Sequence, residues 1–104
     1  RPALYEAHHG IVPVRKKAAK ALTYDVVGPV CESGDWLGRD RELAVEEGDL
    51  LAILSAGAYG FVMASNYNTR PKPAEIMVDG KNAFVIRARE KTTDLFASET
   101  VLPK

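Results

Sequence analysis

The sequence lacks several features that would assign a protein class directly. It has one cysteine among 104 residues, so no disulfide can form within the chain. Lysine and arginine number 14, as do aspartate and glutamate, and zero net charge gives no general attraction to nucleic acid or anionic lipid. No apolar run approaches the roughly 18 residues of a membrane-spanning helix. We therefore expect no nucleic-acid and no membrane partner, and a free thiol suits the reducing cytoplasm.

Common catalytic and metal-binding motifs are also missing. The sequence has no HExxH metal motif and no GxSxG nucleophile elbow. His8 and His9 are adjacent, so on a helix their side chains diverge by about 100° and do not readily chelate one ion. We expect no metal site. A signal-peptide pattern is absent too, but this excludes little because the first residue is Arg1 rather than methionine.

The composition is that of an ordinary folded domain. Hydrophobic residues make up 46% of the chain and charged residues 27%, enough for a core and a solvated surface. We predict a single domain over residues 1–104, because this length is typical of one domain.

Short β-rich runs separated by turns dominate the chain. Strands are predicted near residues 11–14 and 22–27, and the continuous apolar run at 50–54 predicts a strand covered on both faces. AEIMV and KNAFVIRAR flank Asp79-Gly80, which predicts a β-hairpin. Short helices are expected at the start of the chain and over residues 92–98, the latter capped by Thr92 or Thr93. With five to seven strands, we predict a mainly-β barrel or sandwich.

Candidate functional residues lie on the predicted loops. Cys31 and Glu32 fall in a Glu-Ser-Gly-Asp turn after the second strand. An acidic neighbour disfavours the thiolate, so a neutral Cys31 thiol suits proton donation better than nucleophilic attack. The alternative is a buried cysteine that only packs.

Three further residues suit anion binding. Arg1 and Tyr5 are four apart and would share a helical face, where a guanidinium and a phenol could clamp a carboxylate. An exposed helical arginine is the alternative. Tyr59 lies between glycines and could reach an anion with its hydroxyl, or be an ordinary core or rim tyrosine.

Three segments together resemble one known family. RPALYEAHH is similar to the R-P-A-x-Y-x-x-x-H stretch of diaminopimelate decarboxylases, and GPVCESGD resembles their most distinctive signature. GAYGFVMASNYNTRPKPAE resembles their G-A-Y-G-x-x-M-x-S-N-Y-N-x-R-x-x-x-E segment. The order and spacing agree from Arg1 to about Thr92. His8 stands where the family commonly has an aromatic residue.

The resemblance implies a fold, a reaction and a cofactor. The chain would be the C-terminal β domain of the alanine racemase and ornithine decarboxylase type, a barrel or sandwich. The whole enzyme would convert meso-2,6-diaminopimelate to L-lysine and carbon dioxide with pyridoxal 5'-phosphate bound mainly by a (β/α)8 barrel. This chain carries no lysine motif for that cofactor, so we expect it to be inactive alone.

The resemblance also implies residue roles in a homodimer with shared active sites. Cys31 would act in the partner's site as the proton donor, and Glu32 would pair there with the distal ammonium group of the substrate. Arg1 and Tyr5 would bind a substrate carboxylate, and Tyr59 would contact cofactor and substrate. Two alternatives are a related decarboxylase of another basic amino acid and a non-catalytic β module used for oligomerisation.

Overall fold

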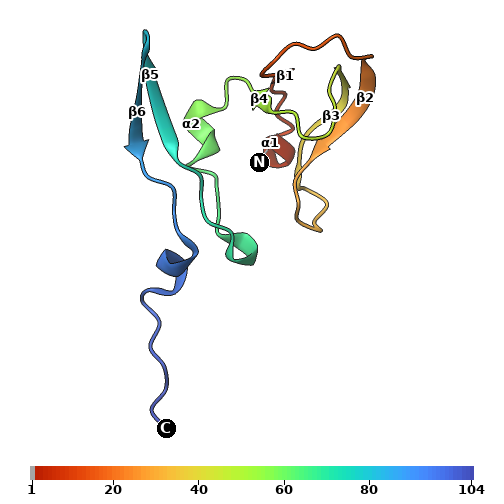
Figure 1. The fold of residues 1–104 in the computed structure, drawn as a ribbon. Helices are drawn as coiled ribbons and strands as arrows, with labels where there is room; N and C mark the ends of the chain where they lie inside the picture. Colours follow the sequence, from red (N-terminus) through yellow and green to blue (C-terminus); the bar gives the residue numbers. More distant parts are fainter. Residues whose placement is uncertain (1) are drawn as a thin grey trace. The chain divides into compact units, whose positions relative to one another are not determined.

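The computed structural model describes residues 2–104, which divide into unit 1, Arg1–Gly60, and unit 2, Phe61–Lys104. Unit 1 contains short strands framed by two single-turn helices: α1 (Pro2–Tyr5), β1 (Ile11–Pro13), β2 (Leu22–Val27), β3 (Trp36–Leu43), β4 (Leu51–Ile53) and α2 (Gly57–Gly60). Unit 2 contains a β-hairpin and two 3₁₀ turns: η1 (Tyr67–Thr69), β5 (Glu75–Asp79), β6 (Asn82–Arg87) and η2 (Thr92–Phe96). Each unit can be followed in Figure 1.

Two antiparallel strand pairs form unit 1. β1 pairs with β4, so that Ile11 lies opposite Ile53. β2 pairs with β3 from Leu22↔Leu43 to Val27↔Trp36, with register shifts near Val26. These pairs bring the loop between β2 and β3 to one end of a two-stranded ribbon (Figure 1).

The core of unit 1 is small and depends on one close approach. Ile11 and Leu43 are its buried hydrophobic side chains, at 8% and 5% exposure. A Cβ at Gly38 would lie 2.7 Å from Ile11 Cδ1 and 2.8 Å from Arg41 Nε. Glycine at this position therefore lets β3 approach the Ile11 side chain.

The longest strand, β3, has no counterpart among the predicted strands. Its central residues Arg39, Asp40, Arg41 and Glu42 are all charged, which hides the apolar pattern. Asp40 also has a positive φ of 51°, and its N–H donates to Asp25 Oδ1 at 2.9 Å. A local irregularity of this kind interrupts the two-residue alternation by which strands are recognised.

The predicted burial of the strand at residues 50–54 on both faces was wrong. β4 contains only Leu51–Ile53, and these residues are half-buried. The flanking Leu50 and Leu54 are 72% and 44% exposed. The continuous apolar run correctly predicted a strand here, but the side chains of this run are less buried within this chain than predicted.

Unit 2 contains the predicted hairpin. Asp79 lies opposite Asn82, and Gly80 has a positive φ of 58° in the turn between them. One face of the hairpin carries Ile76, Val78 and Val85, and the other carries Met77, Phe84 and Ile86. All six are at least half exposed, so within unit 2 neither face is covered.

The segments flanking the hairpin are tied together by Glu90. Its Oε2 accepts hydrogen bonds from Asn66 Nδ2 at 2.7 Å and from the Lys72 N–H at 2.8 Å. These bonds lower the pKa of Glu90, the Lys72 bond first and the Asn66 bond next. They close a loop in which Asn68 and Thr69 adopt positive φ.

The predicted closing helix is shorter and differently capped. η2 covers Thr92–Phe96, and its N-cap residue is Lys91 rather than Thr92 or Thr93. The Asp94 carboxylate accepts the Lys91 N–H at 2.8 Å, which starts the turn one residue earlier than predicted.

The mainly-β prediction, with short helices at the start and near the end, is confirmed over residues 2–104, and six strands fall within the predicted five to seven. The single-domain assignment stays a prediction. None of the helices described is both long and apolar enough to cross a membrane.

Candidate functional site

The loop between β2 and β3, residues 28–35, is closed by short-range backbone hydrogen bonds. At its base the Gly28 N–H donates to the Asp35 carbonyl at 2.8 Å. Inside the loop, the Asp35 N–H donates to the Glu32 carbonyl at 3.0 Å, and the Glu32 N–H donates to the Val30 carbonyl at 2.9 Å. The loop therefore consists of consecutive tight turns, as the Glu-Ser-Gly-Asp sequence predicts.

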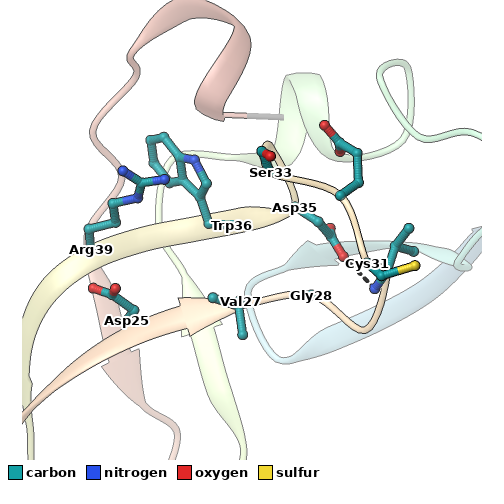
Figure 2. Close-up of a pocket in the computed structure, with 10 residues that line it drawn as sticks. Asp25, Val27, Gly28, Cys31, Ser33, Asp35, Trp36 and Arg39 are labelled. Carbon is teal, nitrogen blue, oxygen red and sulfur yellow. Dashed lines mark hydrogen bonds between the residues drawn. The ribbon is translucent and has the colours of Figure 1, made fainter.

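The Asp35 carboxylate occupies the inside of this loop. Its Oδ2 accepts the Val30 N–H at 2.7 Å (Figure 2). A Cβ at Gly28 would overlap both carboxylate oxygens of Asp35. Glycine at position 28 is thus required for the carboxylate to reach its backbone partner.

Cys31 and Glu32 lie side by side on the outside of the loop. Both are exposed, and the Cys31 sulfur points away from Asp35 (Figure 2). Glu32 Oε1 accepts the Gly34 N–H at 2.9 Å. The predicted position of the thiol and the carboxylate, on a loop at a strand end, is confirmed.

A surface hollow of about 340 Å³ adjoins the loop. Cys31 is among its lining residues, and the lining includes three carboxylates, of Asp25, Glu32 and Asp35, against one guanidinium, of Arg39. Arg39 lies over the Trp36 ring, 4.8 Å from its centroid (Figure 2). The excess of carboxylates favours a positively charged ligand group, such as an ammonium.

The predicted anion-binding residues do not line this hollow. Tyr5 ends α1 and is 71% exposed, while Tyr59 lies in α2 and is 61% exposed. Arg1 falls outside the described residues. The structure thus brings together Cys31 and Glu32, and it places the two tyrosines elsewhere on the surface of unit 1.

Each histidine has its own partner. His9 Nδ1–H donates to the Leu54 carbonyl at 3.0 Å, which ties the segment before β1 to the end of β4. The two amino nitrogens of Arg41 lie 3.2 Å from the two ring nitrogens of His8. Among the described residues, no group of three or more histidine, cysteine or acidic side chains is placed to hold a metal ion.

Sequence reasoning missed the residues that shape the hollow. Asp35 was recognised only as part of a turn, and Asp25, Trp36 and Arg39 were not singled out. A usable signal did exist for Asp35, because aspartate side chains commonly accept backbone N–H groups within their own turn. For Arg39 and Trp36, which belong to the unpredicted strand β3, the sequence offered no comparable signal.

Together, a mainly-β fold and a braced loop that presents a thiol beside a carboxylate define the class of this chain. Residues 1–57 match the family described as pyridoxal-dependent decarboxylase, C-terminal sheet domain. The chain belongs to this family.

Curated proteins named diaminopimelate decarboxylase are similar to the chain over its whole length. It is 58% identical to that of Vibrio cholerae and 59% identical to that of Pseudomonas fluorescens, each over 104 residues, which are 100% of this chain and 25% of each relative. The chain therefore spans about a quarter of the length of these relatives. The resemblance inferred from the three sequence segments is confirmed.

Solved structures extend the likeness to the fold. The crystal structure of diaminopimelate decarboxylase from M. jannaschii matches with a TM-score of 0.89 at 47% identity, covering 99% of this chain and 24% of that chain. The Helicobacter pylori enzyme complexed with L-lysine matches with a TM-score of 0.84 at 45% identity, covering 95% of this chain and 25% of that one. The likeness thus includes unit 2, which lies beyond the family match at residue 57.

Proposed function

We propose that this chain is the C-terminal sheet domain of a diaminopimelate decarboxylase, which converts meso-2,6-diaminopimelate to L-lysine and carbon dioxide. The observation that carries the proposal is that the consecutive residues Cys31 and Glu32 lie on an exposed, internally braced loop beside a carboxylate-rich hollow. The relatives named diaminopimelate decarboxylase, which match over the whole chain, support the choice of substrate.

Among the described residues, Tyr59 is the one that we assign to contact with pyridoxal 5'-phosphate. Bound to the enzyme, this cofactor supplies the electron sink that decarboxylation requires. Tyr59 is exposed, and nothing lies within 4 Å of a Cβ built at either flanking glycine, Gly57 or Gly60. A flat ring can approach such an open surface, so we assign Tyr59 to cofactor and substrate contact. The remaining cofactor contacts, including a lysine, are assigned to the rest of the full-length protein.

In this proposal Cys31 is the proton donor. After carbon dioxide leaves, the Cys31 Sγ–H gives its proton to the substrate α-carbon. A donor has to reach the substrate, and the outward-pointing, exposed sulfur meets that requirement.

Glu32, Arg1 and Tyr5 select the substrate. Diaminopimelate carries an ammonium and a carboxylate at its distal end, so a site with partners for both rejects a simpler basic amino acid. The Glu32 carboxylate pairs with the ammonium, consistent with the excess of carboxylates in the hollow. Arg1 and Tyr5 bind the carboxylate.

In the full-length protein, this chain would be part of a larger assembly. We propose that residues 1–104 form a single domain, a barrel or sandwich, in a cytoplasmic homodimer. Cys31 and Glu32 would act in the partner subunit's active site. The exposed apolar hairpin faces of unit 2 support an arrangement in which further protein covers this domain.

The test is turnover by the full-length protein, with carbon dioxide and L-lysine measured together. Cys31→Ala should lower kcat by roughly 100-fold or more. Glu32→Gln should lower kcat/KM for diaminopimelate by roughly 100-fold and leave cofactor absorbance unchanged. Glu47→Gln, in the turn before β4, is the matched control and should have little effect.

Two results would redirect the proposal. Faster turnover of another basic amino acid, with no selective loss in Glu32→Gln, would identify a related decarboxylase. Unchanged decarboxylation and product in Cys31→Ala would indicate a non-catalytic β module.

A further inference from the structure

The Asp35 carboxylate has a specific backbone partner next to the proposed proton donor. Asp35 Oδ2 accepts the N–H of Val30, the residue directly before Cys31, at 2.7 Å. The backbone of Asp35 is fixed at the same time, since its carbonyl accepts the Gly28 N–H and its N–H donates to the Glu32 carbonyl. One residue thus connects the base, the inside and the tip of the loop.

We propose that Asp35 is a positioning residue for Cys31, acting through the Val30 N–H. This inference rests on the proposed function, in which Cys31 delivers a proton to a substrate carbon. The carboxylate is directed into the loop and the sulfur away from it, so Asp35 acts on the thiol through the backbone rather than by contact (Figure 2).

The composition of the loop makes such a brace necessary. Gly28 and Gly34 lie in the loop, and glycine allows many backbone conformations. Pro29 fixes only its own φ, so without the bond from Val30 to Asp35 the Val30–Cys31 segment between the two glycines would lose its side-chain brace. Proton transfer needs heavy atoms within about 3 Å, and a misplacement of about 1 Å can cost roughly 100-fold in rate.

The requirement is for an acceptor atom at one place rather than for negative charge. An asparagine amide oxygen can accept the same N–H from the same position. A glutamate keeps the charge, but its extra methylene group moves the carboxylate away from the position at which Asp35 Oδ2 accepts the Val30 N–H. The two conservative variants therefore separate geometry from electrostatics.

The experiment uses the full-length protein and compares Asp35→Ala, Asp35→Asn and Asp35→Glu. Asp49→Ala is the control, because Asp49 Oδ2 accepts the Glu46 N–H at 2.9 Å in the turn at the opposite end of β3, although its Oδ1 also pairs with Lys17 Nζ at 2.6 Å. Asp35→Ala should lower kcat by about 100-fold with KM changed less than about threefold. Asp35→Asn should stay within about fivefold of wild type, Asp35→Glu should fall well below it, and Asp49→Ala should stay within about twofold.

A double-mutant cycle distinguishes positioning from a general loss of structure. In the Cys31→Ala background, adding Asp35→Ala should lower kcat by less than about threefold, because the thiol that Asp35 positions is already absent. An undiminished 100-fold loss in that background would overturn the inference, as would wild-type kcat in Asp35→Ala. A better enzyme in Asp35→Glu than in Asp35→Asn would overturn it as well, even if Asp35→Ala failed to fold.

Failure of the proposed function has a different signature. If wild type does not release carbon dioxide from diaminopimelate, or if Cys31→Ala is fully active, the proposed reaction is wrong. The brace is then read from amide hydrogen exchange of the Val30 N–H, which should speed up about threefold or more in Asp35→Ala but not in Asp49→Ala. An unchanged exchange rate at Val30 would overturn the positioning role itself.

Discussion

The Cys31 loop and the β5–β6 hairpin obtain their structure in opposite ways. The loop, residues 28–35, satisfies its hydrogen bonds internally and exposes a thiol and a carboxylate. The hairpin is paired along its length with a register shift between Glu75 and Ile76, but Val78 and Val85 on one face are 67% and 68% exposed, and Phe84 on the other is 52% exposed. The loop is thus complete within this chain, whereas the hairpin has apolar faces that only additional protein surface could bury.

Substituting one glycine in each region should give the largest contrast. In the full-length protein, the Cβ of Gly28→Ala would overlap the Asp35 carboxylate, which would have to leave the Val30 N–H. We expect kcat to fall by about 100-fold. Gly80→Ala, in the hairpin turn, meets no atom within 4 Å and has only the strain of a φ of 58°. It should cost about 1 kcal/mol in unfolding free energy and leave kcat unchanged.

Steady-state kinetics and denaturant unfolding of both variants measure this contrast. Equal kcat in Gly28→Ala and Gly80→Ala would show that the loop tolerates rearrangement and that its internal bonds do not define the active geometry.

The same contrast explains which elements could be predicted from sequence. The hairpin followed from Asp79-Gly80 between apolar runs, and the Cys31 turn from Glu-Ser-Gly-Asp, because both signals are local. β3 escaped prediction because its charged centre, which is stabilised by pairing with β2, shows no apolar alternation in the sequence. Burial at residues 50–54 was overestimated because the surface that would cover Leu50 and Leu54 is not in unit 1.

The candidate site could be predicted only in part, as could the fold. Cys31 and Glu32 were identified from residue chemistry and motif resemblance. The part played by Asp35 could not be predicted, because an aspartate in a turn can point to solvent as readily as inward onto the Val30 N–H. Arg39 and Trp36 became visible only once β3 placed them beside the loop.

Replacing Val85 by serine should have different effects in the isolated chain and in the full-length protein. Val85 is already 68% exposed here, so the 104-residue chain should lose less than about 0.5 kcal/mol of unfolding free energy. If further protein covers the hairpin, the full-length protein should lose about 2 kcal/mol, the usual value of burying such a side chain. Urea unfolding of both proteins measures the difference.

Val101→Ser is the control for Val85, because Val101 is 92% exposed near the C-terminus. It should have little effect in either protein. The isolated chain should also bind a hydrophobic dye such as ANS, and Val85→Ser should reduce that binding. A loss below 0.5 kcal/mol in the full-length protein would mean that this face of the hairpin stays exposed.

The smallest predicted effect concerns Glu90, which gives unit 2 an internal brace like that of Asp35 in unit 1. Hydrogen bonds from the Lys72 N–H and Asn66 lower the pKa of Glu90 below its ordinary value of 4.5. A carboxyl whose pKa is lower in the folded state contributes stability above its unfolded pKa and loses it as pH falls through the folded value. Unfolding free energy should therefore decrease below about pH 4.5, partly through Glu90.

Glu90→Gln should flatten this decrease, because glutamine does not titrate, and should slightly lower stability at pH 7, where the carboxylate is the stronger acceptor. Unfolding of the full-length protein at pH values between about 3 and 7 measures the slope. Glu99→Gln removes the same charge from an exposed position after η2 and should leave the slope nearly unchanged. If both variants behave alike, the brace at Asn66 and Lys72 adds no pH-dependent stability. In that case the Glu90 carboxylate would not stabilise the segments flanking the hairpin more than an amide does.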